Sequence, residues 1–395
     1  MKVLKFLLAG CLVLAGIGVV GTGVTLGEVY KNNQTVYEAS ESATLNQAAL
    51  ENVYIESDVP VRIMPTEGKA RVEFEASGHG LMIPEPKYKL DVTSEGKSSY
   101  INLKEVQGPE VYLFTNNIRQ ELTVYLPEKD MNTLKVVTNT LNYHKSFSYA
   151  SKANINDLVL NVGAIDLDLE GNYNQVDIRS RNSGNGSIKI HSNTPAVMYI
   201  EGDCNTNLTG QIQQVHVKNI YNSDGETINI NSDLEAKIKV DNRYSDVLIE
   251  GKVKDITMNT QGGNLSVDSN TSYNILINAS DYVDTNLKGM IETATIESEY
   301  GNVRLYPTGT PKRIEVLGND VNVHAVLPAD ISGFVYPASV FFYHTFHYSQ
   351  ADSGSFPLFF RCKKRFKHML SKIFWNTAAI ISNLKNCLVL CDGNR

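Results

Sequence analysis

The chain has 395 residues and is 42% hydrophobic and 20% charged, which excludes a disordered chain and allows one or two packed domains. Its net charge of -7 is uneven: the 55 residues from Phe341 onward hold eight Lys or Arg and two Asp or Glu, and the remainder holds 28 basic and 41 acidic residues. An acidic body argues against a nucleic-acid partner, because such binding depends on neutralising phosphates with Lys and Arg.

The chain begins with a segment that predicts a membrane anchor. Residues 6–26 contain no charged side chain, and Lys2 and Lys5 precede them. About 20 apolar residues span a bilayer as a helix, and flanking lysines keep that end of the chain in the cytoplasm. We therefore expect an uncleaved, single-pass signal anchor over residues 1–27, with the body outside the cell membrane.

Two alternatives for this segment remain open at this point. A secretory signal could be cleaved near Gly23 and Thr25, although the small-residue site there is poor. The residues LAGC, ending at Cys11, resemble the cleavage site of a lipoprotein signal. All three alternatives export the body of the protein.

The region after the anchor is expected to be a linker followed by strands. Residues 28–48 are polar and predict a linker. Over residues 49–133, short segments alternate apolar and polar residues and end in turn residues, which predicts strands of an antiparallel sheet with one wet face. These segments are NVYIES, VRIMP, ARVEFEAS, YKLDVTS, SYINLKEV and ELTVYLP.

Residues 134–340 repeat a unit of two apolar residues separated by one residue and followed by a turn rich in Gly, Asn, Asp and Ser. Most successive units are 9 to 13 residues apart. The pattern predicts an all-β fold, with a parallel β-solenoid favoured over a β-sandwich or barrel, because the units are alike and too short to bury a core alone. The units are 165–167, 176–178, 188–190, 215–217, 228–230, 238–240, 247–249, 256–258, 265–267, 275–277, 303–305, 314–316 and 321–323.

One stretch concentrates charge: AIDLDLEGNYNQVDIRSR, residues 164–181, has four carboxylates and two arginines. If each unit stacks on the next, Ile165 lies beside Val176, and outward side chains form columns about 4.8 Å apart. Nearly every carboxylate then has a cation beside it, which predicts a solvent-facing surface of compensated charge. The predicted columns are Asp166 with Asp177 and Lys189, Asp168 with Arg179 and His191, and Glu170 with Arg181.

A carbohydrate-active enzyme on a β-helix is the alternative function. On the register above, Asp166 and Asp177 could lie about 5 Å apart, near the carboxylate separation of a retaining glycosidase. The sequence offers no evident long loop to form a cleft and no evident aromatic platform for a sugar. We therefore expect a protein that is not an enzyme.

Other candidate sites are weaker still. The stretch QGGNLSVD, residues 261–268, is a single imperfect approach to a calcium-binding repeat. Cys204 has no histidine near it in sequence and is expected to be an inert thiol. We predict no catalytic, cofactor-binding or metal-binding residue and no cofactor. A zinc site could be drawn only from four tail residues whose spacings match no known finger: Cys362, His368, Cys387 and Cys391.

The tail, residues 341–395, departs from the repeat and holds the only Trp, three of the eight His and three of the five Cys. Between Phe366 and Leu384 its apolar residues fall on one helical face, with most lysines off that face. This pattern predicts a basic amphipathic helix that can lie on an anionic membrane. A tail foreign to the domain is the alternative.

Several motifs resemble those of a known family. ELTVYLPEKDMNTLKVVTNT (residues 121–140) precedes the repeats, and IESEYGNVRLYP (296–307) and VNVHAVLPADISGF (321–334) follow them. Over about residues 50–340 the chain resembles the bacterial putative-adhesin family of unknown function, which includes LiaG-like cell-envelope proteins. The resemblance implies a β-helix-like domain outside the membrane, often linked to envelope stress, and it brings no catalytic residues.

The combined expectation is a membrane-anchored extracytoplasmic β-solenoid that acts as an adhesin-like binding or scaffold module of a Gram-positive cell envelope. Its expected partner is a cell-wall glycan or an envelope protein, and its N-terminal helix holds it in the membrane. A signalling partner that senses envelope damage through another membrane protein is a further possibility.

Overall fold

The computed structural model describes residues 36–83, 86–108, 111–139, 147–181, 186–219, 225–326 and 328, and three short strands at 339–343, 360–364 and 388–393. The predicted anchor over 1–27 and the predicted helix between Phe366 and Leu384 lie outside these residues. Within the described ranges, no helix is long and apolar enough to cross a membrane.

The described chain consists of β-strands apart from one short 3-10 helix, η1 (Gln47–Ala49). The strands are β1 (Val36–Thr44), β2 (Asn52–Ser57), β3 (Val61–Pro65), β4 (Arg71–Ile83), β5 (Lys87–Glu95), β6 (Ser98–Gln107), β7 (Val111–Leu126), β8 (Met131–Thr138), β9 (Phe147–Ser151), β10 (Ile155–Val162), β11 (Ile165–Gly171), β12 (Gln175–Ser180), β13 (Gly186–Glu201), β14 (Cys204–Lys218), β15 (Thr227–Asp241), β16 (Asp246–Thr260), β17 (Gly263–Ala279), β18 (Val283–Glu297), β19 (Tyr300–Pro307), β20 (Arg313–Leu317), β21 (Asp320–Ala325), β22 (Ser339–Tyr343), β23 (Phe360–Lys364) and β24 (Leu388–Gly393).

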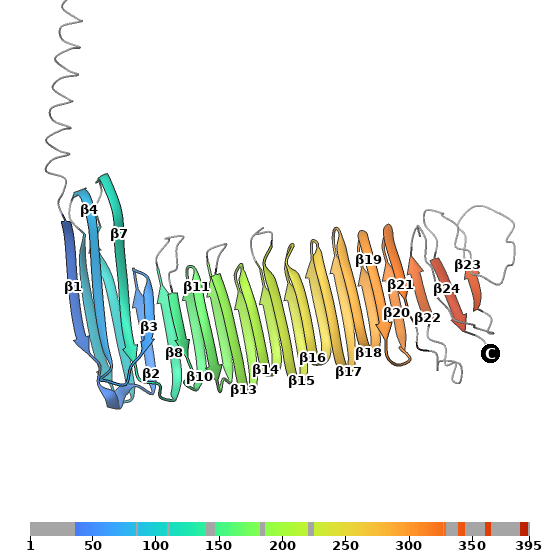
Figure 1. Ribbon diagram of the computed structural model, residues 1–395, viewed down its shortest axis with the longest axis horizontal. Coiled ribbons are helices and arrows are strands. Elements are labelled where there is room, and N and C mark those ends of the chain that lie inside the picture. Colours follow the sequence, from blue (N-terminus) through green and yellow to red (C-terminus); the bar gives the residue numbers. More distant parts are fainter. Residues whose placement is uncertain are drawn as a thin grey trace, which may run out of the picture.

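The strands form a flat solenoid of two sheets packed face to face (Figure 1). One sheet, called face A, contains β3, β9, β11, the first halves of β13 to β18, and then β19 and β21. The other, called face B, contains β2, β8, β10, β12, the second halves of β13 to β18, and then β20 and β22. Successive coils pair in parallel, and the apolar side chains of both sheets make one core between them.

Each long strand contributes to both sheets because it bends in the middle. In β13 the bend lies between Ser192 and Ala196, where the pairing with β14 shifts register. We call this side of the solenoid, where the chain crosses from face A to face B, the arch edge. The opposite side, where the chain crosses from face B of one coil to face A of the next, is the turn edge.

The predicted solenoid is confirmed, and both apolar residues of every predicted unit are buried. Ile188, Thr206, Ile228 and Val247 hold the same position in four successive coils, so one coil takes 18 to 22 residues. A coil therefore contains two of the predicted units, one on each face, and this explains their spacing of 9 to 13 residues.

The predicted stacking of each unit on the next is therefore wrong. Val176 does not lie beside Ile165: it pairs with Leu158 and Met198 on face B. Ile165 belongs to face A, where its strand pairs with β9 and β13. Units a half-coil apart share the sequence pattern, but the bend sends them to opposite sheets.

The predicted columns of charge change accordingly. Asp168 lies beside Lys189 and not beside Arg179, and Arg179 lies beside Glu201. Asp166 is on face A and Asp177 on face B, so the predicted carboxylate pair about 5 Å apart is also wrong.

The two remaining members of those columns also have other partners. Glu170 pairs in register with His191, and its carboxylate lies 3.1 Å from the Lys152 ammonium. Arg181 donates from Nε to the Asn161 side chain at 3.0 Å. The predicted pairing of Glu170 with Arg181 is thus wrong.

All six strands predicted before residue 134 are present, but their directions only partly match the prediction. β4 with β7 and β5 with β6 are antiparallel, as expected. β2 and β3, however, run parallel to their neighbours and already belong to the solenoid. Figure 1 shows β1, β4 and β7 at one end of the stack, where the antiparallel strands cap the core. A period of two does not distinguish these arrangements, because both bury alternate residues.

The arch edge has a period of two coils that is visible in the sequence once the register is known. Coils alternate between a glycine and a serine at the same position: Gly171, Ser192, Gly210, Ser232, Gly251, Ser269 and Gly289. The buried serine hydroxyls donate to arch carbonyls, as from Ser232 to Leu234 at 2.7 Å. Gly289 has a φ of 102° and comes directly against the Ser269 carbonyl.

We expect Gly289→Ala to destabilise the solenoid. A Cβ there would collide with the Ser269 carbonyl oxygen, and the backbone sits in the left-handed region, so a loss of about 1–3 kcal/mol is expected. Gly309→Ala is the matched control, because a Cβ at Gly309 meets nothing within 4 Å. Urea unfolding of the full chain, followed by circular dichroism, measures both; equal midpoints for the two variants would contradict the arch assignment.

Candidate functional site

Face B carries charged side chains that pair with one another. The Arg179 guanidinium lies 3.1 Å from the Asp177 carboxylate, and Lys218 lies 3.0 Å from Glu201. Tyr199 stands between them: its hydroxyl donates to Glu201 at 2.7 Å, and Arg179 lies 5.5 Å from its ring centre. Burial and the bond to Glu201 raise the pKa of Tyr199 to about 12, whereas Tyr199 and Lys218 lower the pKa of Glu201.

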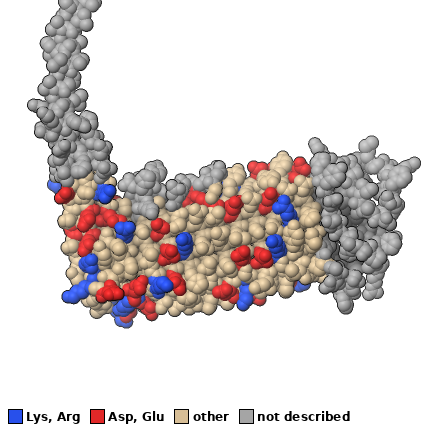
Figure 2. Space-filling model, in the orientation of Figure 1, with Lys and Arg blue, Asp and Glu red and all other residues tan. Residues whose placement is uncertain are grey.

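The network continues over the next coils around Asp241. His216 Nε2 lies 2.7 Å and Lys239 Nζ 2.8 Å from the Asp241 carboxylate, and Asn259 donates to it at 2.6 Å. Burial raises the pKa of Asp241, but hydrogen bonds from Lys239, Asn259 and His216 outweigh this, and the pKa is lowered overall. Charge compensation was predicted for residues 164–181, where Asp177 pairs with Arg179 and Glu170 with Lys152 in place of the predicted partners; the Asp241 network extends the same pattern to later coils. Figure 2 likewise shows acidic and basic side chains interspersed over one face of the molecule.

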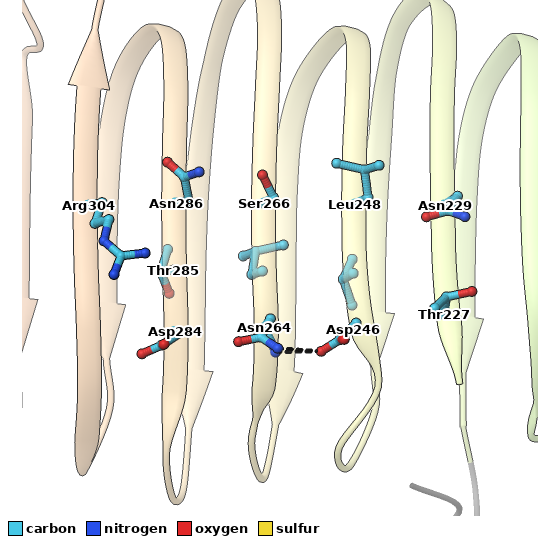
Figure 3. A pocket seen from close by; sticks show the side chains of 12 residues that line it. Thr227, Asn229, Asp246, Leu248, Asn264, Ser266, Asp284, Thr285, Asn286 and Arg304 are labelled. Carbon is cyan, nitrogen blue, oxygen red and sulfur yellow. Dashed lines mark hydrogen bonds between the residues drawn. The ribbon is translucent and has the colours of Figure 1, made fainter. Parts of the chain in front are cut away.

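Face A carries a row of short polar side chains, which we call the polar ladder: Thr227, Asp246, Asn264, Asp284 and Asn302. Asn264 Nδ2 donates to Asp246 Oδ1 at 2.7 Å (Figure 3). Asn302 Nδ2 likewise donates to Asp284 Oδ1 at 2.8 Å. The main-chain N–H groups of both asparagines also donate to these oxygens, at 3.2 and 2.9 Å. Each carboxylate is therefore held in place by the next coil.

A shallow depression of about 270 Å³ lies over the polar ladder on β15 to β19. Its floor is low at Ser266, which lies in register between the larger side chains of Leu248 and Asn286. Arg304 lines it at the β19 end, opposite Asn286 (Figure 3). Within the described residues, the exposed Arg304 makes no hydrogen bond or ion pair, so its guanidinium donors face solvent.

Three exposed tyrosines stand on the turn edge next to this depression; we call Tyr244, Tyr282 and Tyr300 the tyrosine edge. Their exposed fractions are 38%, 46% and 43%. Each lies two residues before a rung of the polar ladder, and Tyr282 bridges to Tyr300 in the next coil. The intervening coil has Gly262, where a Cβ would lie 3.1 Å from Cδ1 of the Tyr244 ring.

Tyr282 is tied to the polar ladder by its hydroxyl. Asn302 Nδ2 donates to that hydroxyl at 3.1 Å, and a hydrogen bond joins Tyr282 to the Asp284 carboxylate. The bond to Asp284 and partial burial raise the pKa of Tyr282. The ring is thus positioned at the margin of face A, and the tyrosine edge and the polar ladder form one continuous surface.

Residues 50–332 match the model of a protein family, Toastrack DUF4097. The chain belongs to the Toastrack family. The match supports the predicted resemblance to an adhesin-like family, and its span agrees with the residues that form the solenoid of this Toastrack protein.

No curated protein matches this Toastrack chain. Among solved structures, a "putative cell adhesion protein" from Clostridium sporogenes aligns at 14% identity over 59% of this chain and 100% of its own length. Its TM-score of 0.25 is too low for the match to inform the fold or the function.

The structure places the other sequence candidates as follows. Asp166 accepts from the Ser187 hydroxyl at 2.8 Å on face A, far along the chain from the depression. Residues 261–268 supply a turn and one rung of the polar ladder; in the described part of this Toastrack chain, no group of three His, Cys, Asp or Glu residues could hold a metal. The four tail residues considered for zinc have no described side-chain placement.

Sequence reasoning missed the tyrosine edge, although a signal exists. Four consecutive coils begin face A with Tyr or Gly, one further residue, and then Asp or Asn: YSD, GGN, YVD and YGN. The pattern becomes visible only with a repeat of about 20 residues. A repeat of about 10 residues mixes the two faces and hides it.

The pH dependence of folding should report the Glu201 interactions. Folding lowers the pKa of Glu201, so the carboxylate adds stability above its ordinary value of 4.5, and this stability is lost as the pH falls below that value. We expect thermal unfolding of Glu201→Gln to shift less than that of the parent chain on acidification below pH 4.5. The exposed Glu235→Gln is the control and should follow the parent; parallel curves for all three would contradict the assignment.

Cys204 should be unreactive in the folded chain, as predicted for an inert thiol. It is buried in the core, and burial raises its pKa to about 12. In a chain whose other cysteines are replaced by serine, we expect a thiol reagent to label Cys204 only in denaturant. Asn207→Cys with Cys204→Ser is the control, because Asn207 is exposed in the same strand and should be labelled at once. Equal labelling rates for the two native proteins would contradict this placement.

Proposed function

We propose that this Toastrack protein is a non-enzymatic, adhesin-like binding module held outside the bacterial cell membrane. The observation that carries the proposal is the contrast between its two faces. Face B pairs its charged side chains with one another, whereas face A offers a depression lined by hydroxyls, amides and carboxylates, with an unpaired Arg304 and exposed tyrosines at its margin. Surfaces of this kind bind a partner through several positioned polar groups.

The solenoid provides the rigidity that such a module needs. Each coil hydrogen-bonds to its two neighbours along both faces, and the core runs without interruption through all of them. A stack of this kind displays the same outward position at regular intervals over a long surface. The binding surface is therefore already formed before the partner binds, which lowers the entropy lost by side chains on binding.

Export and anchoring rest on the sequence. The uncharged residues 6–26, preceded by Lys2 and Lys5, support a single-pass signal anchor with the body outside the membrane. Family membership supports the adhesin-like role, and the resemblance to LiaG-like envelope proteins favours a link to envelope stress in a Gram-positive cell. The partner in this proposal is a cell-wall glycan or an envelope protein.

The enzymatic alternative loses its main support. It required Asp166 and Asp177 to act as a pair, and these two carboxylates face outward on opposite sides of the molecule. The Asp177 carboxylate also forms an ion pair with the Arg179 guanidinium. A binding role needs no such pair.

The proposal is tested by exposing intact cells to protease. The full chain, with a C-terminal tag, is produced in a Gram-positive host and recovered with the membrane fraction. We expect added protease to remove the tag from intact cells, and the purified full chain in detergent to co-sediment with isolated envelopes without releasing soluble sugar. A tag that is cut only after lysis, or sugar release that Asp166→Ala abolishes, would overturn the proposal.

A further inference from the structure

The tyrosine edge and the polar ladder carry an inference about the ligand, which rests on the proposed function. We propose that together they bind an extended β-1,4-linked polysaccharide that lies lengthwise along the solenoid over β15 to β19. The observation that suggests this is a line of exposed rings that runs parallel to a line of planar polar side chains. Each of four successive coils supplies one polar side chain, and three of the four supply a ring.

The spacing of the rings fits a straight chain of sugars. Parallel strands lie about 4.8 Å apart, so Tyr282 and Tyr300 present rings one coil apart and Tyr244 lies two coils before Tyr282. The three rings therefore span about 14 Å along the axis. A β-1,4-linked glycan is an extended ribbon whose pyranose rings follow one another at a comparable interval. A helical or strongly branched glycan departs from the line after one or two sugars.

The chemistry of the two lines is complementary to the two surfaces of a sugar. A pyranose ring has a C–H face that packs on an aromatic ring, and a tyrosine adds a polar tip. Its hydroxyl groups lie around the rim and need both donors and acceptors, which carboxylates and primary amides supply. The rungs alternate along the axis as Asp246, Asn264, Asp284 and Asn302, so acceptors and donors also alternate. Successive sugars of a β-1,4 chain are turned over, which gives the ligand the same period of two.

The surface is set in this form before any ligand arrives. Asp246 and Asp284 are each fixed by two hydrogen bonds from the next coil, and Tyr282 is held by Asn302. Gly262 leaves space beside Tyr244 for its ring to lie over the turn edge. Little side-chain freedom is therefore lost when a glycan binds, which lowers the entropic cost of binding.

A polysaccharide fits this surface better than a folded protein does. The buried centre of a protein interface is typically more apolar than the rest of the protein surface. The depression is lined mainly by Asp, Asn, Ser and Thr. Leu248 is its one partly exposed apolar side chain, and the flat tyrosine rings lie at its margin. Arg304, at the end of the depression, adds guanidinium donors that can reach a sugar hydroxyl or a carboxylate substituent.

The test measures oligosaccharide binding to the purified full chain in detergent by titration calorimetry. Chitohexaose and cellohexaose are the β-1,4-linked probes, and maltohexaose, which is α-1,4-linked and curved, is the control ligand. We expect at least one β-1,4-linked probe to bind and maltohexaose to fail. Binding should weaken at least about tenfold in a variant with Tyr282→Ala and Tyr300→Ala, because two ring contacts are lost.

Two further variants separate binding from folding. Val197→Ala with Leu276→Ala removes two exposed apolar side chains from face B and should leave the affinity unchanged. Tyr282→Phe with Tyr300→Phe keeps the rings and should retain most of the affinity, while unfolding midpoints verify that each variant is folded. Unchanged affinity in the alanine variant, equal binding of maltohexaose, or no oligosaccharide binding would overturn the inference. Capture of an envelope protein without any oligosaccharide binding would overturn it too, yet leave the adhesin-like function standing.

Discussion

Main-chain hydrogen bonding between parallel coils is the constraint on which the rest of the structure depends. It holds each residue directly beside its counterpart in the next coil, so that side chains fall into columns along both faces. Inward columns must be apolar to form the core, and outward columns become lines of like or complementary groups. The face B charge network, the polar ladder and the tyrosine edge are all consequences of this one rule, applied to different outward positions.

The bends impose a second constraint, because the backbone must leave its ladder at each edge. At the arch edge, successive coils alternate between two residues. One coil has a serine whose hydroxyl donates a hydrogen bond to a main-chain carbonyl, and the next has a glycine that allows the two coils to approach closely. At the turn edge the chain bends through other residues, among them Gly262 and Gly263, and these small residues leave room for exposed tyrosine rings. The residues at the edges therefore determine where a ligand can approach, and the outward side chains of the flat faces determine which groups it contacts.

The sequence predicts the fold class and most of the core correctly, for a clear physical reason. Pairs such as Ile228 with Ile230 alternate with polar residues, and a period of two is the direct signature of a strand with one buried face. Units with a smaller or polar member escaped notice, such as Thr206 with Leu208 and Ala294 with Ile296. The register could not be predicted, because units on the two faces look alike and only the bend separates them. The candidate surface depends on that register, and it was therefore missed.

The most direct measurement of this account is disulfide cross-linking in a chain whose native cysteines are replaced by serine. Residues one coil apart on the same face have Cα atoms close enough for a disulfide, whereas residues half a coil apart lie on opposite faces. The account predicts that Asp168→Cys with Lys189→Cys oxidises readily to a cross-linked chain, and that Asp168→Cys with Arg179→Cys does not. Cross-linking of the second pair and not of the first would contradict the two-faced coil and the surface derived from it.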